Sequence, residues 1–312
     1  MFPVFSGPST PVTANPYAAE VERATAVSIG PGSSGARVLR AQILLACERF
    51  SPGEIDGRYG DDLVIAIKGY QETHDLKATG TIDAAMWKLL DAHKGALLIS
   101  YTITAADVKG PFAPIPPTAA EQSKLKWMGF ETAEEELGEK FQMSPKLLAQ
   151  LNPGKKFNVA GERITVTNIR LTPARHASRV VVSKSQRTVT AYGAGKLILA
   201  QYPATIGGAH DPLPIGTWKI IGIVRMPWFH WDPVHYWNVD PDKAPENLPP
   251  GPNNPAGLVW IALSKAHYGI HGTSDPGHVH YGESYGCVRL TNWDASDLAR
   301  MVTPGTPAIL EE

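Results

Sequence analysis

Two residues near the end of the sequence are candidate nucleophiles: Ser284 and Cys287, in the stretch G-E-S-Y-G-C-V-R-L at 282–290. The serine stands in the pattern G-x-S-x-G, which in α/β-hydrolases presents a catalytic serine on a turn between a strand and a helix. The cysteine is the alternative, because a thiol is readily converted to a strongly nucleophilic thiolate. Which residue acts depends on where a base is available.

The positions of the histidines favour the cysteine. In the G-x-S-x-G arrangement the histidine follows the serine, but the last histidine here, His280, precedes Ser284. His271 lies upstream of Cys287, directly after a segment with the pattern of a single strand, residues 258–270. The sequence therefore predicts that His271 takes the proton of the Cys287 thiol and returns it to a leaving amine. Ser284 is expected to shape the turn that presents the thiol.

The neighbours of the cysteine fit this chemistry. Gly286 allows substrate to approach the backbone closely, and the amides of Gly286 and Cys287 are suited to hold a developing oxyanion. Arg289 is two residues beyond the cysteine in a strand-like segment, so its side chain is expected on the same side. There it either binds a carboxylate or fixes the loop through an ion pair. The other cysteine, Cys47, falls on the apolar face of a predicted helix and is expected to be buried and inert.

A metal site is the competing chemistry. Six histidines suggest it: His210, His230, His235, His267, His278 and His280. Imidazole is a common zinc ligand, but no H-E-x-x-H motif occurs and no third ligand for the H-x-H pair is apparent. We therefore predict no metal and no cofactor. These histidines are instead expected at the mouth of the cleft, together with Tyr268 and Thr273, while Trp260 is expected to pack.

Composition excludes several kinds of partner. With 29 Lys and Arg against 30 Asp and Glu in 312 residues, the chain has no basic field to attract nucleic acid or an anionic membrane surface. No apolar run reaches the roughly 18 residues that span a bilayer, and the N-terminus lacks the features of a signal peptide. We expect no nucleic-acid partner and no transmembrane segment, and an export signal that was removed or never present.

The residue pattern predicts a multidomain α+β chain. A lead-in over 1–35, rich in Pro, Ser, Thr and Gly, is expected to be flexible. Helical periodicity predicts a small three-helix domain over 36–95. Residues 99–169 predict the order strand, helix, helix, strand, with Ser144 as a helix N-cap. Residues 177–311 change to period two and predict a mostly β domain.

A long interruption, residues 226–256, breaks the strand pattern of the last domain. It carries five aromatic residues: Trp228, Phe229, Trp231, Tyr236 and Trp237. Connections of this length are uncommon and are frequently functional. The insertion is either a lid beside a cleft or a small aromatic core.

The first two domains each contain a series of short motifs. The motifs V-L-R-A-Q-I-L-L, I-D-G-R-Y-G, A-I-K-G-Y-Q, A-T-G-T-I-D and M-W-K-L-L, in this order, look like a peptidoglycan-binding domain. The segment from Y-T-I-T-A-A-D to A-G-E-R-I-T-V is similar to a LysM glycan-binding module, although the stretch 111–129 makes it longer than that family usually is. A structural spacer is the alternative for this middle segment.

The last domain contains an ordered set of motifs: P-I-G-T-W-K-I, P-P-G-P-N-N-P-A-G-L-V-W-I-A-L-S, Y-G-I-H-G-T-S, S-Y-G-C-V-R-L and P-G-T-P-A-I-L. Together these motifs resemble the L,D-transpeptidase catalytic domain of YkuD type. The resemblance implies that Cys287 attacks a peptidoglycan stem peptide and that a backbone carbonyl orients His271. The departure is Tyr285, where the family most often has histidine.

The resemblance implies a cell-wall enzyme, periplasmic or extracellular, with stem peptides and glycan strands as partners. The thioester on the cysteine would be resolved by an amine of a stem peptide, by a lysine of an anchored lipoprotein, or by water in an L,D-carboxypeptidase. A wall-binding protein without activity is the alternative of another class. Substrate-binding residues are expected beside the catalytic pair: Arg289, Gly272, Thr273, Tyr285, Ser284, Tyr268 and His280.

Overall fold

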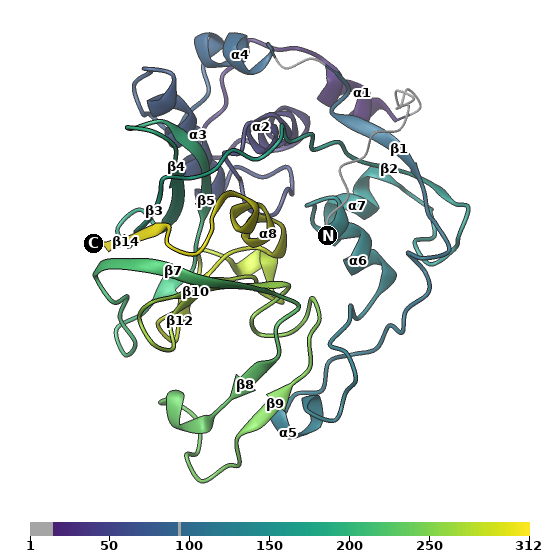
Figure 1. Cartoon of the computed structure of the whole chain (residues 1–312). Helices are drawn as coiled ribbons and strands as arrows, with labels where there is room; N and C mark the ends of the chain where they lie inside the picture. The colour runs from purple at the N-terminus through teal and green to yellow at the C-terminus, as the bar shows by residue number, and fades with distance from the viewer. Residues whose placement is uncertain (1–14, 93–94) are drawn as a thin grey trace. The chain divides into compact units, whose positions relative to one another are not determined.

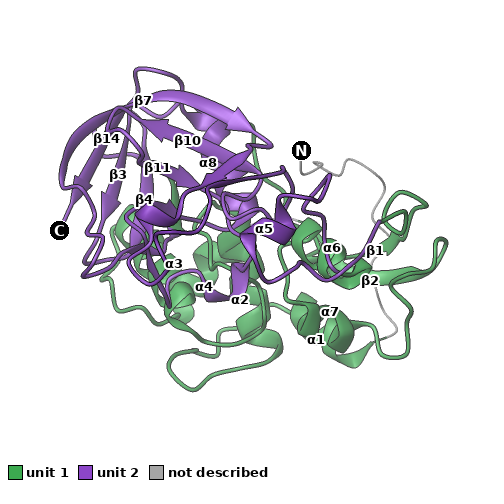
Figure 2. Ribbon diagram, turned by 90° about the horizontal axis from the view of Figure 1, so that it is seen from below, with its two compact units in different colours: residues 1–110, 132–173, 200–202 green, residues 111–131, 174–199, 203–312 purple. Residues whose placement is uncertain are grey.

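The structure is a computed structural model that describes residues 15–92 and 95–312, so the first part of the expected lead-in lies outside it. It divides into two compact units, green and purple in Figure 2. Unit 1 holds the residues up to 110, 132–173 and 200–202, and unit 2 holds 111–131, 174–199 and 203–312. Among the described residues, no helix is long and apolar enough to cross a membrane.

Three helices form the first part of unit 1, as predicted (Figure 1). They are α2 (Ala36–Cys47), α3 (Asp61–Thr73) and α4 (Ala84–Leu90). Leu39 of α2 and Ile67 of α3 are fully buried in the core that these helices share. Cys47 is also buried, and burial raises the pKa of its thiol to about 11, so the prediction of an inert packing residue is supported.

The prediction of a flexible lead-in over 1–35 is wrong for the residues that form a further helix, α1 (Pro16–Glu22). The side chain of Asn15 caps this helix by accepting a hydrogen bond of 2.9 Å from a backbone N–H of the first turn. Ala18 and Val21 are fully buried, and α1 packs against α2. Two apolar residues are too few to show helical periodicity, and the composition, rich in Pro, Ser, Thr and Gly, predicts flexibility instead.

The second part of unit 1 has the predicted order of strand, helix, helix and strand. Its elements are β1 (Leu98–Thr102), α6 (Ala133–Lys140), α7 (Pro145–Leu151) and β2 (Arg163–Thr167). β1 and β2 pair in an antiparallel manner. Ser144 caps α7, as expected, by accepting a hydrogen bond of 3.1 Å from the backbone N–H of Leu147. That these elements form a LysM module stays a prediction.

A large sheet is the centre of unit 2, in the order β13-β11-β10-β7-β14-β3-β4-β5. The strands are β3 (Arg179–Ser183), β4 (Thr188–Tyr192), β5 (Ile198–Pro203), β7 (Gly216–Arg225), β10 (Val259–Leu263), β11 (Gly269–His271), β13 (Val288–Arg289) and β14 (Pro307–Glu311). The helix α8 (Asn292–Met301) packs against β10 and β11. The mostly β architecture predicted for the last domain is confirmed.

The segment 258–270, expected to be one strand, is a hairpin. β10 ends at Leu263 and β11 begins at Gly269, and the two strands pair in an antiparallel manner. His267 in the turn has a φ of 68°, a conformation that residues other than glycine seldom adopt. The turn contains none of the Asn-Gly or Asp-Gly pairs that usually mark a hairpin, so the sequence does not show it.

Short elements of unit 2 lie around this sheet. They are α5 (Ala119–Gln122), β6 (Ile206–Gly207), β8 (Phe229–Trp231), η1 (Pro233–His235), β9 (Glu246–Leu248), η2 (Pro276–His278) and β12 (Glu283–Ser284). β6 pairs with β12, and β8 pairs with β9 inside the 226–256 insertion. α5 belongs to the stretch 111–131 and packs against β9.

Candidate active site

The turn before β13 presents Cys287. Ser284 is buried, and its hydroxyl donates a hydrogen bond to the carbonyl oxygen of Cys287. Gly286 has a φ of 89°, and a Cβ on it would lie 2.8 Å from the ring of Tyr268. On Gly207 of β6, a Cβ would lie 3.1 Å from the Cα of Gly286. The position of the thiol therefore depends on small residues and on a serine that closes the turn.

His271, the last residue of β11, has one fixed tautomer. The side chain is buried, and its Nδ1 lies 2.7 Å from the carbonyl oxygen of Gly272. A carbonyl oxygen can only accept, so Nδ1 carries the proton. The Nε2 atom of the neutral ring is then an acceptor, which is the state that a general base requires. The backbone carbonyl that the family resemblance predicted is that of Gly272.

Close packing around Asn292 fixes this carbonyl. A Cβ on Gly272 would lie 2.2 Å from the Oδ1 of Asn292, and a Cβ on Gly257 would lie 2.1 Å from it. Asn292 is fully buried; its Oδ1 accepts from the N–H of Leu258 at 3.0 Å, and its Nδ2 donates to the carbonyl oxygen of Pro252 at 3.2 Å. Because both ends of the amide are held, a side chain on either glycine would displace the Gly272 peptide.

Register partners on four strands place a row of side chains on one face of the sheet. Val224 pairs with Trp260, Trp260 pairs with His271, and His271 pairs with Arg289. Partners in register point to the same side. The rings of Trp260 and His271 stack, with centroids 5.1 Å apart and an interplanar angle of 17°. Cys287 lies two residues before Arg289 and opens into the same cleft.

The electrostatic environment keeps the imidazole neutral. Burial, and then the positive charge of Arg289, lower the pKa of His271 to about 3, against the opposing effect of the hydrogen bond to Gly272. No ion pair joins the Arg289 guanidinium to a carboxylate within the described chain, so the structure favours a free cation over the structural ion pair considered for it. His271 is therefore uncharged throughout the physiological pH range.

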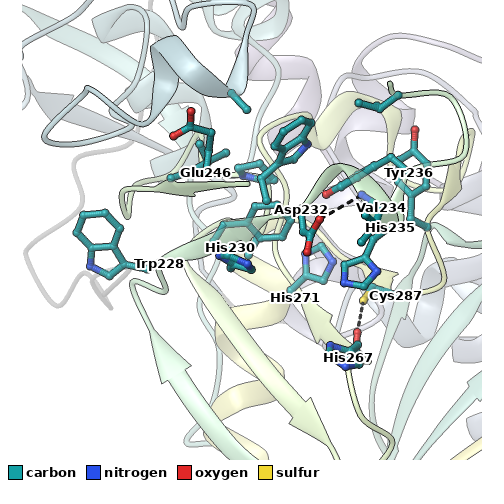
Figure 3. A pocket seen from close by; sticks show the side chains of 18 of the residues that line it. Trp228, His230, Asp232, Val234, His235, Tyr236, Glu246, His267, His271 and Cys287 are labelled. Atoms are coloured by element: carbon teal, nitrogen blue, oxygen red, sulfur yellow. Dashed lines mark hydrogen bonds between the residues drawn. The ribbon is translucent and has the colours of Figure 1, made fainter. Parts of the chain in front are cut away.

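The thiol of Cys287 is also neutral at rest. Burial raises the pKa of Cys287, although a backbone hydrogen bond with Gly269 and the charge of Arg289 oppose this effect. The Sγ–H donates to the carbonyl oxygen of His267 at 3.6 Å, as the dashed line in Figure 3 shows. The resting site thus holds a neutral thiol and a neutral imidazole, and a nucleophilic attack by Cys287 would require loss of the thiol proton.

A cleft of about 1750 Å³ contains both residues (Figure 3). One wall is the sheet face with Trp260, His271 and Arg289. The 226–256 insertion contributes another wall, which includes all five of its aromatic residues. A third set of lining residues comes from the stretch 111–131: Pro117, Thr118, Ala119, Ala120 and Gln122. No pattern in the sequence predicts this last contribution.

Tyr285 connects the active-site turn to the insertion. Its hydroxyl donates to the Oδ1 of Asn238 at 2.8 Å. Its ring meets that of Tyr236 edge-on, with centroids 4.5 Å apart. Tyr236 lines the cleft, and burial raises its pKa to about 12. The residue that departs from the common family pattern therefore contacts the inserted segment.

Some predicted substrate-binding residues lie outside the walls of this cleft. Thr273 is buried, and its hydroxyl oxygen accepts from the N–H of Asp275 at 3.2 Å. The backbone N–H of His280 donates to the Oγ1 of Thr205 at 2.9 Å. The hydroxyl of Ser284 is used in the hydrogen bond to the carbonyl oxygen of Cys287. Of the other predicted residues, Arg289, Tyr285 and Tyr268 line the cleft, whereas Gly272 accepts the hydrogen bond of His271 and Gly286 lies in the turn that presents Cys287.

The histidines that suggested a metal site do not form one cluster. The rings of His235 and His267 have centroids 5.6 Å apart, and His210 stacks on Trp237. Nδ1 of the exposed His278 lies 2.8 Å from a carboxylate oxygen of Asp275. Over the described parts of the chain, no three His, Cys, Asp or Glu side chains are close enough to hold a metal ion.

A buried neutral histidine and a cysteine in one cleft are the groups that a cysteine acyltransferase or hydrolase uses. Residues 177–310 match the L,D-transpeptidase catalytic domain, YkuD, and residues 34–90 match the putative peptidoglycan binding domain. The chain is 31% identical to a putative L,D-transpeptidase YkuD of Bacillus licheniformis over 174 residues. These residues are 55% of this chain and 89% of the relative. The chain therefore belongs to the YkuD L,D-transpeptidase family.

Two further proteins are similar. A putative L,D-transpeptidase YkuD of Bacillus subtilis is 29% identical over 167 residues, which are 53% of this chain and 85% of the relative. The solved structure of an L,D-transpeptidase from Mycobacterium smegmatis is 19% identical, with a TM-score of 0.36, over 51% of this chain and 76% of that one. The family assignment rests on the sequence relatives.

Proposed function

We propose that this protein is a peptidoglycan L,D-transpeptidase with Cys287 as its nucleophile. The observation that carries the proposal is the hydrogen bond from Nδ1 of His271 to Gly272, which leaves Nε2 as an acceptor in the cleft that holds the thiol. A neutral imidazole in this state is suited to take the thiol proton during attack. Membership of the L,D-transpeptidase family supports the same reaction.

The first half of the reaction forms a thioester. Sγ of Cys287 attacks the carbonyl carbon of the third, diamino-acid residue of a tetrapeptide stem while Nε2 of His271 takes the thiol proton. The amides of Gly286 and Cys287 stabilise the oxyanion. The bond to the terminal D-alanine then breaks, and the imidazolium gives its proton to the leaving amine. Arg289, with its free charge on the same sheet face, is proposed to bind a substrate carboxylate.

The second half transfers the acyl group. An amine attacks the thioester carbonyl, His271 takes the proton of that amine, and the thiolate leaves and is protonated. An amine of a neighbouring stem gives a cross-link between third residues. A lysine of a lipoprotein gives an anchored protein, and water gives an L,D-carboxypeptidase. The cross-linking reaction is the one we propose, because the relatives carry the name of transpeptidases.

The remaining parts of the chain are proposed to hold the enzyme on its substrate. The peptidoglycan-binding domain over 36–95 supports attachment to the wall, and the order β1, α6, α7, β2 over 99–169 supports a LysM-like module that binds glycan. A catalytic domain over 177–311 then acts on nearby stems. An enzyme of this kind works in the periplasm or the extracellular cell wall.

The 226–256 insertion is proposed to be a lid rather than a separate aromatic core. Trp228 and Trp237 are 64% and 62% exposed, which is too much for residues of a core. Both line the cleft that contains the thiol. The hydrogen bond between Tyr285 and Asn238 attaches the middle of the insertion to the active-site turn. These contacts are those of a segment that covers a site.

A carbapenem tests the nucleophile directly. Incubation followed by mass spectrometry should show a single covalent adduct on the Cys287 peptide. Cys47→Ala is the matched control and should react like the unaltered protein, whereas Cys287→Ala should not react. Absence of an adduct on the unaltered protein would indicate a wall-binding protein without activity.

Isolated sacculi test the reaction. Digestion and muropeptide analysis should show loss of tetrapeptides, release of D-alanine and new cross-links between third residues. Loss of tetrapeptides without cross-links would identify a carboxypeptidase. An activity that survives Cys287→Ala and is abolished by a chelator would identify a metallohydrolase and overturn the proposal.

A further inference from the structure

Residues 111–131, here called the strap, lie in the sequence between two parts of unit 1 but belong to unit 2. They fall outside both matched family segments, 34–90 and 177–310, so the family pattern gives them no role. Five strap residues nevertheless line the cleft that contains Cys287. The strap is therefore a candidate part of the active site.

Specific contacts attach the strap to the loop 249–257. The N–H of Met128 donates to the carbonyl oxygen of Pro250 at 2.9 Å, and the carbonyl oxygen of Met128 accepts from the N–H of Asn253 at 3.1 Å. The side chain of Asn253 also donates to the carbonyl oxygen of Gly129 at 3.0 Å. Met128 is 1% exposed. These hydrogen bonds thus join the backbone of the strap to the loop 249–257.

The fit between strap and loop leaves no space. Gly251 has a φ of 152°, and a Cβ on it would lie 2.0 Å from the carbonyl oxygen of Met128. The same loop provides Pro252, whose carbonyl oxygen accepts from Asn292, and Gly257, which packs against the Gly272 peptide. One loop therefore supports both the strap and the carbonyl that orients the catalytic histidine.

The strap contributes a surface without charge. Its lining residues are Pro117, Thr118, Ala119, Ala120 and Gln122. The charge of Arg289 lies instead beside Cys287 and His271. A carboxylate-bearing part of a substrate fits the end of the cleft near Arg289, whereas a neutral, hydroxyl-bearing part fits the strap.

Exposed aromatic rings mark the same end of the cleft. In Figure 3, Trp228 and Glu246 lie on the side away from Cys287. Glu246 belongs to β9, against which α5 of the strap packs. Trp228 is 64% exposed, and exposed apolar rings in a groove are typical of ligand-binding surfaces. The C–H face of a sugar ring can cover an indole, while its hydroxyls stay hydrated.

The size of the cleft leaves room for more than one stem peptide. At about 1750 Å³ it exceeds the roughly 300–1,000 Å³ that is usual for a single small ligand. Three extended residues reach roughly 10 Å, so a sugar carried by the first residue of a stem lies well away from the thiol. We propose that the strap forms the distal wall of the cleft and binds the sugar-bearing end of a disaccharide-peptide donor.

This inference rests on the proposed transpeptidase function, and substrate comparison tests it. The specificity constant for D-alanine release is measured with a free tetrapeptide and with the same peptide carrying its disaccharide. The unaltered protein should favour the disaccharide form by tenfold or more. Ala119→Trp, which fills the strap side of the cleft, should remove this preference and change the reaction of the free tetrapeptide by less than twofold.

Lys124→Trp is the matched control, because Lys124 is an exposed strap residue outside the cleft walls. It should keep the preference. Acylation by a small carbapenem should be equal in the unaltered protein, Ala119→Trp and Lys124→Trp, because it reports whether the site is folded. If Ala119→Trp does not fold, Ala120→Trp takes its place. If Ala119→Trp lowers both peptide reactions equally, or neither, the strap proposal is overturned. If the unaltered protein neither reacts with carbapenem nor releases D-alanine, the proposed function itself has failed.

Discussion

His271 and Arg289 are register partners on the neighbouring parallel strands β11 and β13. The guanidinium and the imidazole therefore share one face of the sheet, and the positive charge opposes protonation of the ring. The same charge favours the thiolate of Cys287. The charge of Arg289 thus adds to the effect of burial on the pKa of His271 and opposes the effect of burial on the pKa of Cys287, and both are the directions that the proposed reaction needs.

The first prediction concerns the pH dependence of acylation. With the pKa of His271 at about 3, the base stays neutral as the pH falls from 8 to 5. The second-order rate of carbapenem acylation, followed by mass spectrometry, should change by less than about twofold over this range. A histidine with an ordinary pKa of about 6.5 would lose roughly 30-fold of its neutral form at pH 5. A tenfold fall in rate would contradict the assignment.

Arg289→Gln provides the internal comparison for this experiment. Removal of the positive charge raises the pKa of His271 and also that of Cys287, because the charge lowers both. The acid limb of the rate profile should therefore move to higher pH, and the rate on the plateau should fall. A profile that keeps its position would show that burial alone keeps the imidazole neutral.

The second prediction concerns stability. The folded-state pKa of His271 lies below its unfolded value of about 6.5, so its contribution is fully present above pH 6.5 and is lost as the pH falls toward 3. At pH 5 the loss is about 2 kcal/mol. Hydrogen exchange of the peptide that contains β11 should become correspondingly faster at pH 5, after correction for the intrinsic rate. His271→Gln has no such titration and should show no change beyond that correction.

Local patterns in the sequence were sufficient to propose Cys287 and His271 as the catalytic pair, and the structure places both residues in one cleft. Cys287 and His271 each lie in a short motif, and the change from helical to strand periodicity separated the two kinds of architecture. The row of side chains from Trp260 to Arg289 could not be predicted. The hairpin of β10 and β11 lacks the usual turn residues, so its sequence has the pattern of one strand. Which partner a side chain faces depends on register, and register is a property of strand pairing rather than of one segment.

The strap could not be predicted for a different reason. Met128 is joined to Pro250 and Asn253, and no local period relates residues so distant in sequence. The stretch 111–129 lies inside the middle module in the sequence, so its excess length predicts a longer middle module rather than a part of unit 2. The helix α1, in contrast, had a readable signal: Asn15 before Pro16 is a good N-cap, and it was missed because Pro and Ser dominate the surrounding composition.

The third prediction concerns the carbonyl that orients the base. Gly272→Ala places a Cβ against the Oδ1 of Asn292, which is held by two hydrogen bonds and cannot retreat. The Gly272 peptide must then shift, and Nδ1 of His271 loses its acceptor. D-alanine release should fall by 100-fold or more, of the size expected when a base is misplaced. Gly282→Ala is the matched control, because a Cβ there meets only Thr205, at 3.9 Å; it should keep activity within about twofold. Equal effects of the two substitutions would refute this role of the carbonyl.

The fourth prediction concerns the attachment of the insertion to the active-site turn. Tyr285→Phe and Asn238→Ala each remove the hydrogen bond of 2.8 Å between these residues. A single bond of this kind contributes about 1 kcal/mol, so hydrogen-exchange protection around Asn238 should fall by roughly fivefold in each variant.

The double variant distinguishes this bond from independent effects of the two residues. If the bond is the cause, the double variant should lose no more protection than either single one, since the interaction can be removed only once. Tyr285→His, which restores the residue most common in the family, lacks the hydroxyl and should behave like Tyr285→Phe. Tyr281→Phe removes a hydroxyl from a tyrosine that is 55% exposed and outside the cleft walls, and it should leave the insertion unchanged. Additive losses in the double variant would mean that Tyr285 and Asn238 stabilise the insertion independently rather than through this hydrogen bond.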